Sequence, residues 1–218
     1  SNAGQMKSIY RLGLGHRYGR VMQVIAGVHF NYSLPEDFWP VYKDIMQDSE
    51  QNLTDFQSDQ YFSMLRNLQR YGWLIPYLFG ASPAVCKSFL GGAQTNLQDF
   101  DEYTYYEPYA TSLRMGDIGY QNNKENESGV KACYQNLNSY IKTLQCAIET
   151  PYKGYEEIGV KDDGKYKQLN ANLLPIENDY YSKVRTKQTL TGTEKTIMDL
   201  KKRGVQYVEL CSSTGNEL

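Results

Sequence analysis

The chain has 218 residues, of which 40% are hydrophobic and 13% aromatic, enough to form the core of one large domain or two small ones. Lys and Arg total 23 and Asp and Glu total 25, so the net charge of -2 argues against a basic surface for nucleic acid. No apolar run reaches the roughly 18 residues that a membrane span requires, so we expect a globular protein without a membrane partner.

The first predicted strand covers residues 22–31, where side chains alternate between two faces. The apolar face, suited to a core, carries Met22, Val24, Ala26, Val28 and Phe30. The other face carries Gln23, Ile25, Gly27, His29 and Asn31. An antiparallel sheet often leaves one face in water, so this polar face has a purely structural interpretation. Gly27, which lets another group approach the backbone, favours the alternative of a shallow floor for a ligand.

Two helices are predicted by apolar residues at helical spacing. Residues 58–59 form the expected cap of the first helix, which Gly72 weakens and Pro76 kinks or ends. The second is predicted over residues 130–148 by apolar side chains at every third or fourth position, and it ends before Pro151.

The C-terminal part of the chain contains a predicted turn at residues 162–164 that feeds a strand, then a capped helix closed by Gly204 and a strand over residues 205–210. Glu209 and Cys211 lie on one face of that strand. Strands and helices mix without regular βαβ alternation. This order favours an α+β fold with an antiparallel sheet over a doubly wound sheet.

Four cysteines contain no CxxC pair, which argues against a zinc site. They are Cys86, Cys133, Cys146 and Cys211. With no signal peptide, we expect reduced thiols and a cytoplasmic protein. Residues 1–3 resemble a residual expression tag, and we exclude them from fold reasoning.

Several polar residues have both a chemical and a structural interpretation. The guanidinium of Arg114, in a polar stretch with glycines, suits phosphate or carboxylate, but it also suits a surface salt bridge. The same two interpretations apply to a cluster of Glu177, Asn178, Tyr181 and Arg185, where Asn and Asp also favour a turn. His29 and Glu209, on different strands, can both reach a hard divalent cation once the fold brings them together.

The sequence resembles, block by block and in the same order, the central part of the proteobacterial type of glutamate-cysteine ligase, also called γ-glutamylcysteine synthetase. The blocks are "IYRLGLGHRYGRVMQVIAGVHFNYSLP", "RYGWLIPYLFGASPAVC", "YATSLRMGDIGY", "LNANLLPIENDYYSKVR" and "RGVQYVEL". The resemblance covers residues 4–210, so we treat residues 1–3 as a tag scar and residues 211–218 as a divergent tail.

The resemblance implies an enzyme that joins the γ-carboxyl of glutamate to the amine of cysteine at the expense of ATP, through a γ-glutamyl phosphate, as the first step of glutathione biosynthesis. It also implies a fold similar to glutamine synthetase, in which an antiparallel sheet lines a funnel and helices pack on the other face. In this chain we expect that fold to be incomplete at both ends. The polar face of the first strand is then the floor of the funnel.

The resemblance further implies roles for individual residues. His29 and Glu209 would bind magnesium, and Arg114 would be the catalytic residue that holds the transferring phosphate. The residues around the amino-acid substrates would be Tyr10, Leu14, Gln23, Tyr120, Asn178 and Tyr181. Among these, Tyr120 and Tyr181 suit the carboxylate of cysteine. The implied cofactor is Mg²⁺, with glutamate, cysteine and ATP as substrates.

Two departures from the family pattern predict a site that lacks part of its metal ligands and one phosphate contact. The acidic N-terminal segment of the family is absent, and Cys211 stands where the family has an arginine. Loss of such a charge-stabilising donor costs about 10²- to 10³-fold in rate. The alternative function is a non-catalytic binding module that keeps the amino-acid pocket or contributes it to a partner chain. We also expect apolar surface left exposed by truncation, and therefore a homo-oligomer.

Overall fold

The structure, a computed structural model, describes residues 1–20, 23, 27–92, 94–113, 131–180, 182–189 and 195–214. Its helices are α1 (Asn2–Tyr18), α2 (Phe38–Ile45), α3 (Leu53–Tyr71), α4 (Leu74–Phe79), α6 (Leu137–Glu149), α7 (Lys153–Ile158) and α8 (Thr196–Arg203), with 3-10 turns η2 (Lys87–Leu90) and η3 (Glu177–Asp179). Its strands are β1 (Gly27–Tyr32), β2 (Ala84–Cys86), β3 (Gln98–Asp99), β4 (Thr104–Tyr106), β5 (Lys161–Asp162), β6 (Lys165–Tyr166), β7 (Val184–Lys187) and β8 (Tyr207–Thr214). Mixed helices and antiparallel strands confirm the predicted α+β class.

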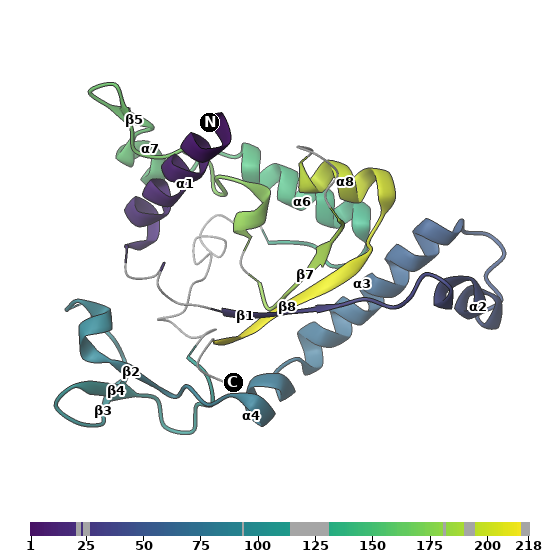
Figure 1. Ribbon diagram of the computed structural model, residues 1–218, viewed down its shortest axis with the longest axis horizontal. Helices are drawn as coiled ribbons and strands as arrows, with labels where there is room; N and C mark the ends of the chain where they lie inside the picture. The colour runs from purple at the N-terminus through teal and green to yellow at the C-terminus, as the bar shows by residue number, and fades with distance from the viewer. Residues whose placement is uncertain are drawn as a thin grey trace.

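The central sheet has the strand order β1-β8-β7, and both strand pairs are antiparallel. Strand β8 therefore lies in the middle, which brings the first and last strands of the chain side by side (Figure 1). Glu209 of β8 lies opposite Asn31 of β1 on one side and opposite Arg185 of β7 on the other. Side chains at opposed positions share a face, so this register gathers polar groups from three strands in one row.

One face of this sheet packs on helices α3, α6 and α8 to form the hydrophobic core. Val184 of β7 and Val208 of β8 are 1% and 0% exposed and belong to the same buried cluster as Phe62 and Leu65 of α3. Because side chains alternate along a strand, the neighbours of these valines point to the opposite face. Packing of the valines in the core therefore places the alternate residues, such as Arg185 and Glu209, on the polar face.

In the described residues the first predicted strand corresponds to β1, Gly27–Tyr32. Residues 21–22 and 24–26 lie outside the described residues, and Gln23 precedes the strand. The prediction that Phe30 is in the core is wrong, because Phe30 is 61% exposed. The physical reason is that β1 is an edge strand, whereas the buried strand residues of the core come from β7 and β8.

The predicted helices exist, but their starts differ. Helix α3 begins at Leu53, capped by the side chain of Asn52, so the predicted cap at residues 58–59 is wrong. Ser58 instead lies inside the helix, where its hydroxyl donates to the carbonyl of Thr54 at 2.8 Å. Helix α3 ends at Tyr71, and the proline expected to end it lies in the separate helix α4.

The second predicted helix, α6, begins at Leu137 rather than at residue 130. The side chain of Asn136 accepts the backbone N–H of Ser139 at 2.9 Å and so caps the helix there. Residue 130 itself lies outside the described residues. The apolar stripe continues as predicted, because Ile141 and Leu144 are both buried.

Near the C-terminus, the turn at residues 162–164 is confirmed as the hairpin between β5 and β6, with Asp163 at φ 47° and Gly164 at φ 75°. Helix α8 ends at Gly204, as predicted. Strand β8 continues to Thr214. Residues 211–214, which we expected to belong to a divergent tail, are therefore part of the central sheet.

Helix α1 begins at Asn2, and the hydroxyl of Ser1 accepts the N–H of Gly4 at 3.3 Å. The residues set aside as a tag scar are thus part of this helix. In the described part of the chain, no helix combines the length and the apolar character needed to cross a membrane.

Gly204 allows a direct test of the packing between α8 and α3. It has φ 71° and ψ -166°, and an added Cβ would lie 2.6 Å from the hydroxyl of Ser58. We expect Gly204→Ala to lower the free energy of unfolding by about 2 to 4 kcal/mol, through backbone strain plus overpacking. Denaturant titration measures the loss.

The control is Gly164→Ala, at φ 75° with nothing within 4 Å of an added Cβ. Only the backbone cost applies there, and we expect a loss of about 1 kcal/mol. Equal losses in the two variants would show that the contact with α3 contributes nothing.

Candidate functional site

A cluster of polar side chains occupies the face of the central sheet opposite the core. Each oxygen of the Glu209 carboxylate has its own partners. Oε1 lies 3.1 Å from Nδ1 of His29 on β1, while Oε2 lies 2.7 Å from Nη2 of Arg185 and 3.4 Å from Nζ of Lys187 on β7. The central strand is therefore joined to both outer strands through one side chain. His29 and Glu209 are also in contact, as a metal ion bound by both residues would require.

Cys211, two residues after Glu209, completes this cluster. Its side chain is buried, and its Sγ lies 3.3 Å from Nδ1 of His29 and 3.5 Å from Nη2 of Arg185. A β-bulge produces this arrangement, because the pairing shifts between Val28 and Phe30 and two residues of β8 lie opposite His29. We name the group His29, Arg185, Lys187, Glu209 and Cys211 the strand cluster.

Electrostatics favours the ionised carboxylate in the strand cluster. Burial works to raise the pKa of Glu209, but the charges of Arg185, Lys187 and His29 together outweigh it, so its pKa lies below the usual value. Burial, aided by the adjacent Arg185, lowers the pKa of Lys187. Burial also raises the pKa of the Cys211 thiol, against the opposing effect of Arg185. The cluster thus places one carboxylate beside two cations.

Arg185 connects the strand cluster to the segment around η3. Its Nη1 donates to the carbonyl oxygens of Asn178 at 3.0 Å and Tyr180 at 3.3 Å. The hydroxyl of Tyr10 on α1 donates to Oδ1 of the buried Asp179 at 2.8 Å. Of the residues expected around the amino-acid substrates, Asn178 therefore accepts a hydrogen bond from Arg185 of the strand cluster, and Tyr10 is bonded to its sequence neighbour Asp179.

The other expected site residues have different surroundings. Leu14 is 3% exposed, so its side chain packs inside the protein rather than facing an open site. Nε2 of Gln23 donates to the carbonyl of Arg11 at 3.1 Å, which holds it against α1. The side-chain Oδ1 of Asn178 accepts the hydroxyl of Thr196 at 3.3 Å. The remaining three, Arg114, Tyr120 and Tyr181, lie outside the described residues.

The donor atoms of His29 and Glu209 fit part of a magnesium site. Their 3.1 Å separation is close to the roughly 3 Å between adjacent ligands of an octahedral ion with bonds of about 2.1 Å. Magnesium prefers oxygen, so this pair supplies only two of its ligands and leaves the others to phosphate, carboxylate or water. Arg185 and Lys187 beside the pair favour an anionic ligand such as phosphate.

Sequence reasoning left Arg185 undecided between a turn and a site and did not consider Lys187. The available signal was alternation in the stretch Val184–Lys187, where the two basic residues are separated by one position and therefore share a face. The closeness of Cys211 to His29 could not be anticipated in this way, since it depends on the β-bulge.

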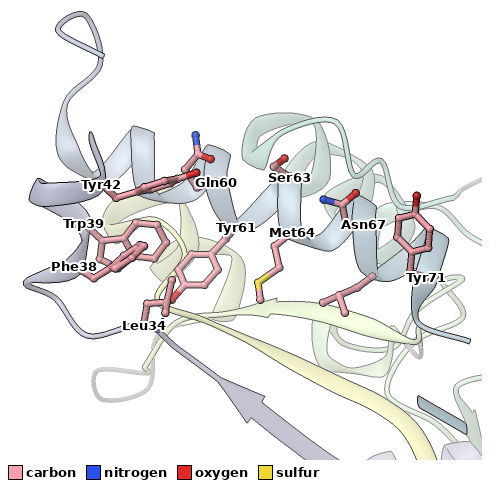
Figure 2. A pocket seen from close by; sticks show the side chains of 11 residues that line it. Leu34, Phe38, Trp39, Tyr42, Gln60, Tyr61, Ser63, Met64, Asn67 and Tyr71 are labelled. Atoms are coloured by element: carbon pink, nitrogen blue, oxygen red, sulfur yellow. Dashed lines mark hydrogen bonds between the residues drawn. The ribbon is translucent and has the colours of Figure 1, made fainter. Parts of the chain in front are cut away.

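A separate pocket lies between α2 and α3 (Figure 2). Its walls are formed by Leu34, Phe38, Trp39, Tyr42, Gln60, Tyr61, Ser63, Met64, Asn67, Leu68 and Tyr71. None of these lining side chains is charged, and none belongs to the strand cluster. Among the residues that the structure describes, the group of His, Cys and Glu side chains close enough to hold a metal ion together lies in the strand cluster.

Comparison with known proteins gives a consistent result. The family described as Glutamate-cysteine ligase matches residues 1–214. Curated proteins named glutamate–cysteine ligase from Hahella chejuensis and from Pseudomonas aeruginosa strain PAO1 are 51% and 50% identical over 210 residues. Each comparison covers 96% of this chain but only 39% of the relative.

Two solved structures resemble the chain. One is the glutamate–cysteine ligase of Francisella tularensis in complex with AMP, with a TM-score of 0.83 and 39% identity over 97% of this chain and 40% of that one. The other is a bifunctional glutathione synthetase from Pasteurella multocida, with a TM-score of 0.61 and 25% identity over 92% of this chain and 21% of that one.

The link between α1 and η3 is testable through Tyr10. We expect Tyr10→Phe to lower the free energy of unfolding by about 1 to 2 kcal/mol, because the buried Asp179 loses a hydrogen-bond donor. The control is Tyr103→Phe, whose side chain is 67% exposed and whose effect should stay within about 0.5 kcal/mol. Denaturant titration compares them, and indistinguishable stabilities would contradict the link.

Proposed function

The chain belongs to the glutamate-cysteine ligase family, and we propose that it carries part of an active site for ATP-dependent ligation of glutamate to the amine of cysteine. The observation that carries this proposal is the strand cluster, which sets His29 beside Glu209 next to two cations. The chain spans about two fifths of the length of its relatives, so the proposal assigns it a share of the site.

In the proposed reaction, an oxygen of the substrate γ-carboxylate attacks the terminal phosphorus of ATP, and ADP leaves. The amine of cysteine then attacks the acyl carbon of the γ-glutamyl phosphate, forming the amide bond as phosphate leaves and the nitrogen loses a proton. Negative charge accumulates on phosphate oxygens in both steps, so the site needs positive charge rather than a protein nucleophile. A bound Mg²⁺ would neutralise part of that charge.

The residues of this chain have distinct proposed roles. His29 and Glu209 would hold a bound Mg²⁺ through Nδ1 and Oε1. Arg185 is a positioning residue, because its ion pair with Oε2 and its two hydrogen bonds to backbone carbonyls orient the Glu209 carboxylate with Oε1 toward His29. Lys187 adds positive charge on the same face. Arg114 holds the transferring phosphate in this proposal, on the strength of the family resemblance.

The amino-acid substrates are proposed to lie among Tyr10, Leu14, Gln23, Tyr120, Asn178 and Tyr181. Support comes from two hydrogen bonds at the same segment: Arg185 donates to the carbonyl of Asn178, and Tyr10 donates to Asp179, the next residue in the sequence. The polar face of the sheet would then be the floor of a funnel similar to that of glutamine synthetase. The Francisella ligase structure, described as a complex with AMP, supports a nucleotide site in the family.

We also propose that the chain associates with itself or with another polypeptide. Helix α4 supports this, because Tyr77, Leu78 and Phe79 are all 64% to 67% exposed. A group of exposed large apolar side chains of this kind is typical of an interaction site.

A second candidate function, a non-catalytic binding module, is favoured by one observation. Cys211 occupies a position where an arginine is expected by resemblance, so a phosphate contact would be missing. Glutamate and cysteine binding without any release of ADP, even in the context of a complete ligase, would support this alternative.

The test is a chimera in which this chain replaces the matching 210 residues of the Hahella ligase. We expect glutamate- and cysteine-dependent ADP release, which Cys211→Arg raises by about 10²- to 10³-fold by restoring a charge-stabilising donor. Cys146→Arg, at an exposed cysteine, is the control and should leave the rate unchanged. A folded chimera that shows no turnover with either residue at position 211 would contradict the proposed ligase site.

A further inference from the structure

We propose that His29, Glu209 and Cys211 form a binding site for zinc or a similar borderline-soft divalent ion, with the Cys211 sulfur as a ligand. This site goes beyond the proposed ligase function, because it needs neither ATP nor the amino acids. It also differs from a magnesium site in its donor set, since one ligand is sulfur.

The distances between donor atoms fit one ion. Nδ1 of His29, Oε1 of Glu209 and Sγ of Cys211 lie within 4.8 Å of one another, with Nδ1 3.1 Å from Oε1 and 3.3 Å from Sγ. In a tetrahedral zinc site with bonds of about 2.0 to 2.3 Å, ligand atoms lie about 3.3 to 3.6 Å apart. Small side-chain adjustments would therefore place all three on one zinc ion, with a fourth position left for water.

The orientation of the side chains supports the same assignment. A single ring atom, Nδ1 of His29, faces both the carboxylate and the sulfur, and the side chain of His29 is 34% exposed, which gives an ion access. Arg185 holds the other carboxylate oxygen at 2.7 Å, so Oε1 is left for a single metal bond. The same guanidinium lies 3.5 Å from Sγ and so helps to position the sulfur beside Oε1.

Ligand chemistry separates zinc from magnesium at this position. Imidazole and thiolate suit zinc and cobalt, whereas magnesium requires oxygen ligands in an octahedron. The expectation against zinc rested on the absence of CxxC spacing. These ligands instead come from two antiparallel strands, β1 and β8, which local spacing cannot reveal. Since zinc would use His29 and Glu209, it would exclude magnesium from the same residues.

The experiment is a titration of the reduced chain, without an affinity tag, with Co²⁺ as a spectroscopic probe. We expect one equivalent of Co²⁺ to bind and to produce a thiolate-to-cobalt charge-transfer band. Zn²⁺ should displace the cobalt, whereas excess Mg²⁺ should not. Cys211→Ser should abolish the band and weaken Co²⁺ binding by at least tenfold, roughly the smallest effect of losing even an outer partner of a metal ligand.

Two further variants keep the test decisive. His29→Gln, at a partly exposed side chain, should weaken Co²⁺ binding while circular dichroism stays native, which covers the case in which Cys211→Ser does not fold. Cys146→Ser, at an exposed thiol, should keep both the band and the affinity. The proposal is overturned by absence of saturable Co²⁺ binding, by a band that survives Cys211→Ser, or by a band lost in Cys146→Ser.

Discussion

The polar face of the central sheet depends on the contacts that the carboxylate of Glu209 makes with the neighbouring strands. A carboxylate that is largely removed from water is costly unless charges and hydrogen bonds compensate it. Here the compensation comes from both neighbouring strands, with His29 on one oxygen and Arg185 and Lys187 on the other. The register β1-β8-β7 is therefore tied to the chemistry of the face, because a one-residue slip would turn these side chains toward the core.

The same carboxylate also organises more distant parts of the chain. Arg185, paired with Glu209, donates to the carbonyls of Asn178 and Tyr180, and Asp179, which lies between them in the sequence, accepts the hydroxyl of Tyr10 on α1. The metal ligands inferred from the family resemblance are thus connected through Arg185 to a segment that α1 also contacts. Cys211 gives this site a second possible ligand set, because a thiol beside an imidazole suits softer metal ions than the Mg²⁺ that accompanies ATP.

Local patterns in the sequence predicted the α+β class, the α8–Gly204 boundary and the hairpin turn, since each depends on residues close in sequence. Features that depend on the whole fold were not predictable in this way. The alternation of side chains predicted Phe30 in the core, but β1 is an edge strand and Phe30 is exposed. The sequence also predicted a helix cap at Ser58, but Asn52 caps the helix six residues earlier.

The candidate site shows the same division. Sequence reasoning proposed His29 and Glu209 as ligands of one divalent cation, and the resemblance gave them the same role, but only the structure shows their 3.1 Å contact. The contact between Cys211 and His29 depends on a β-bulge that no local sequence pattern predicts. The roles of Arg114, Tyr120 and Tyr181 remain predictions from the resemblance, since these residues lie outside those described.

The most direct test of the central role of Glu209 is a double-mutant cycle on the free energy of unfolding, with Arg185→Met and Glu209→Gln. Because the pair is largely buried and 2.7 Å apart, we expect a coupling of about 2 kcal/mol or more. The exposed pair Lys167 and Asp162, 3.0 Å apart, provides the comparison and should couple by less than about 1 kcal/mol. A coupling for Arg185 and Glu209 no larger than that of the exposed pair would contradict the account.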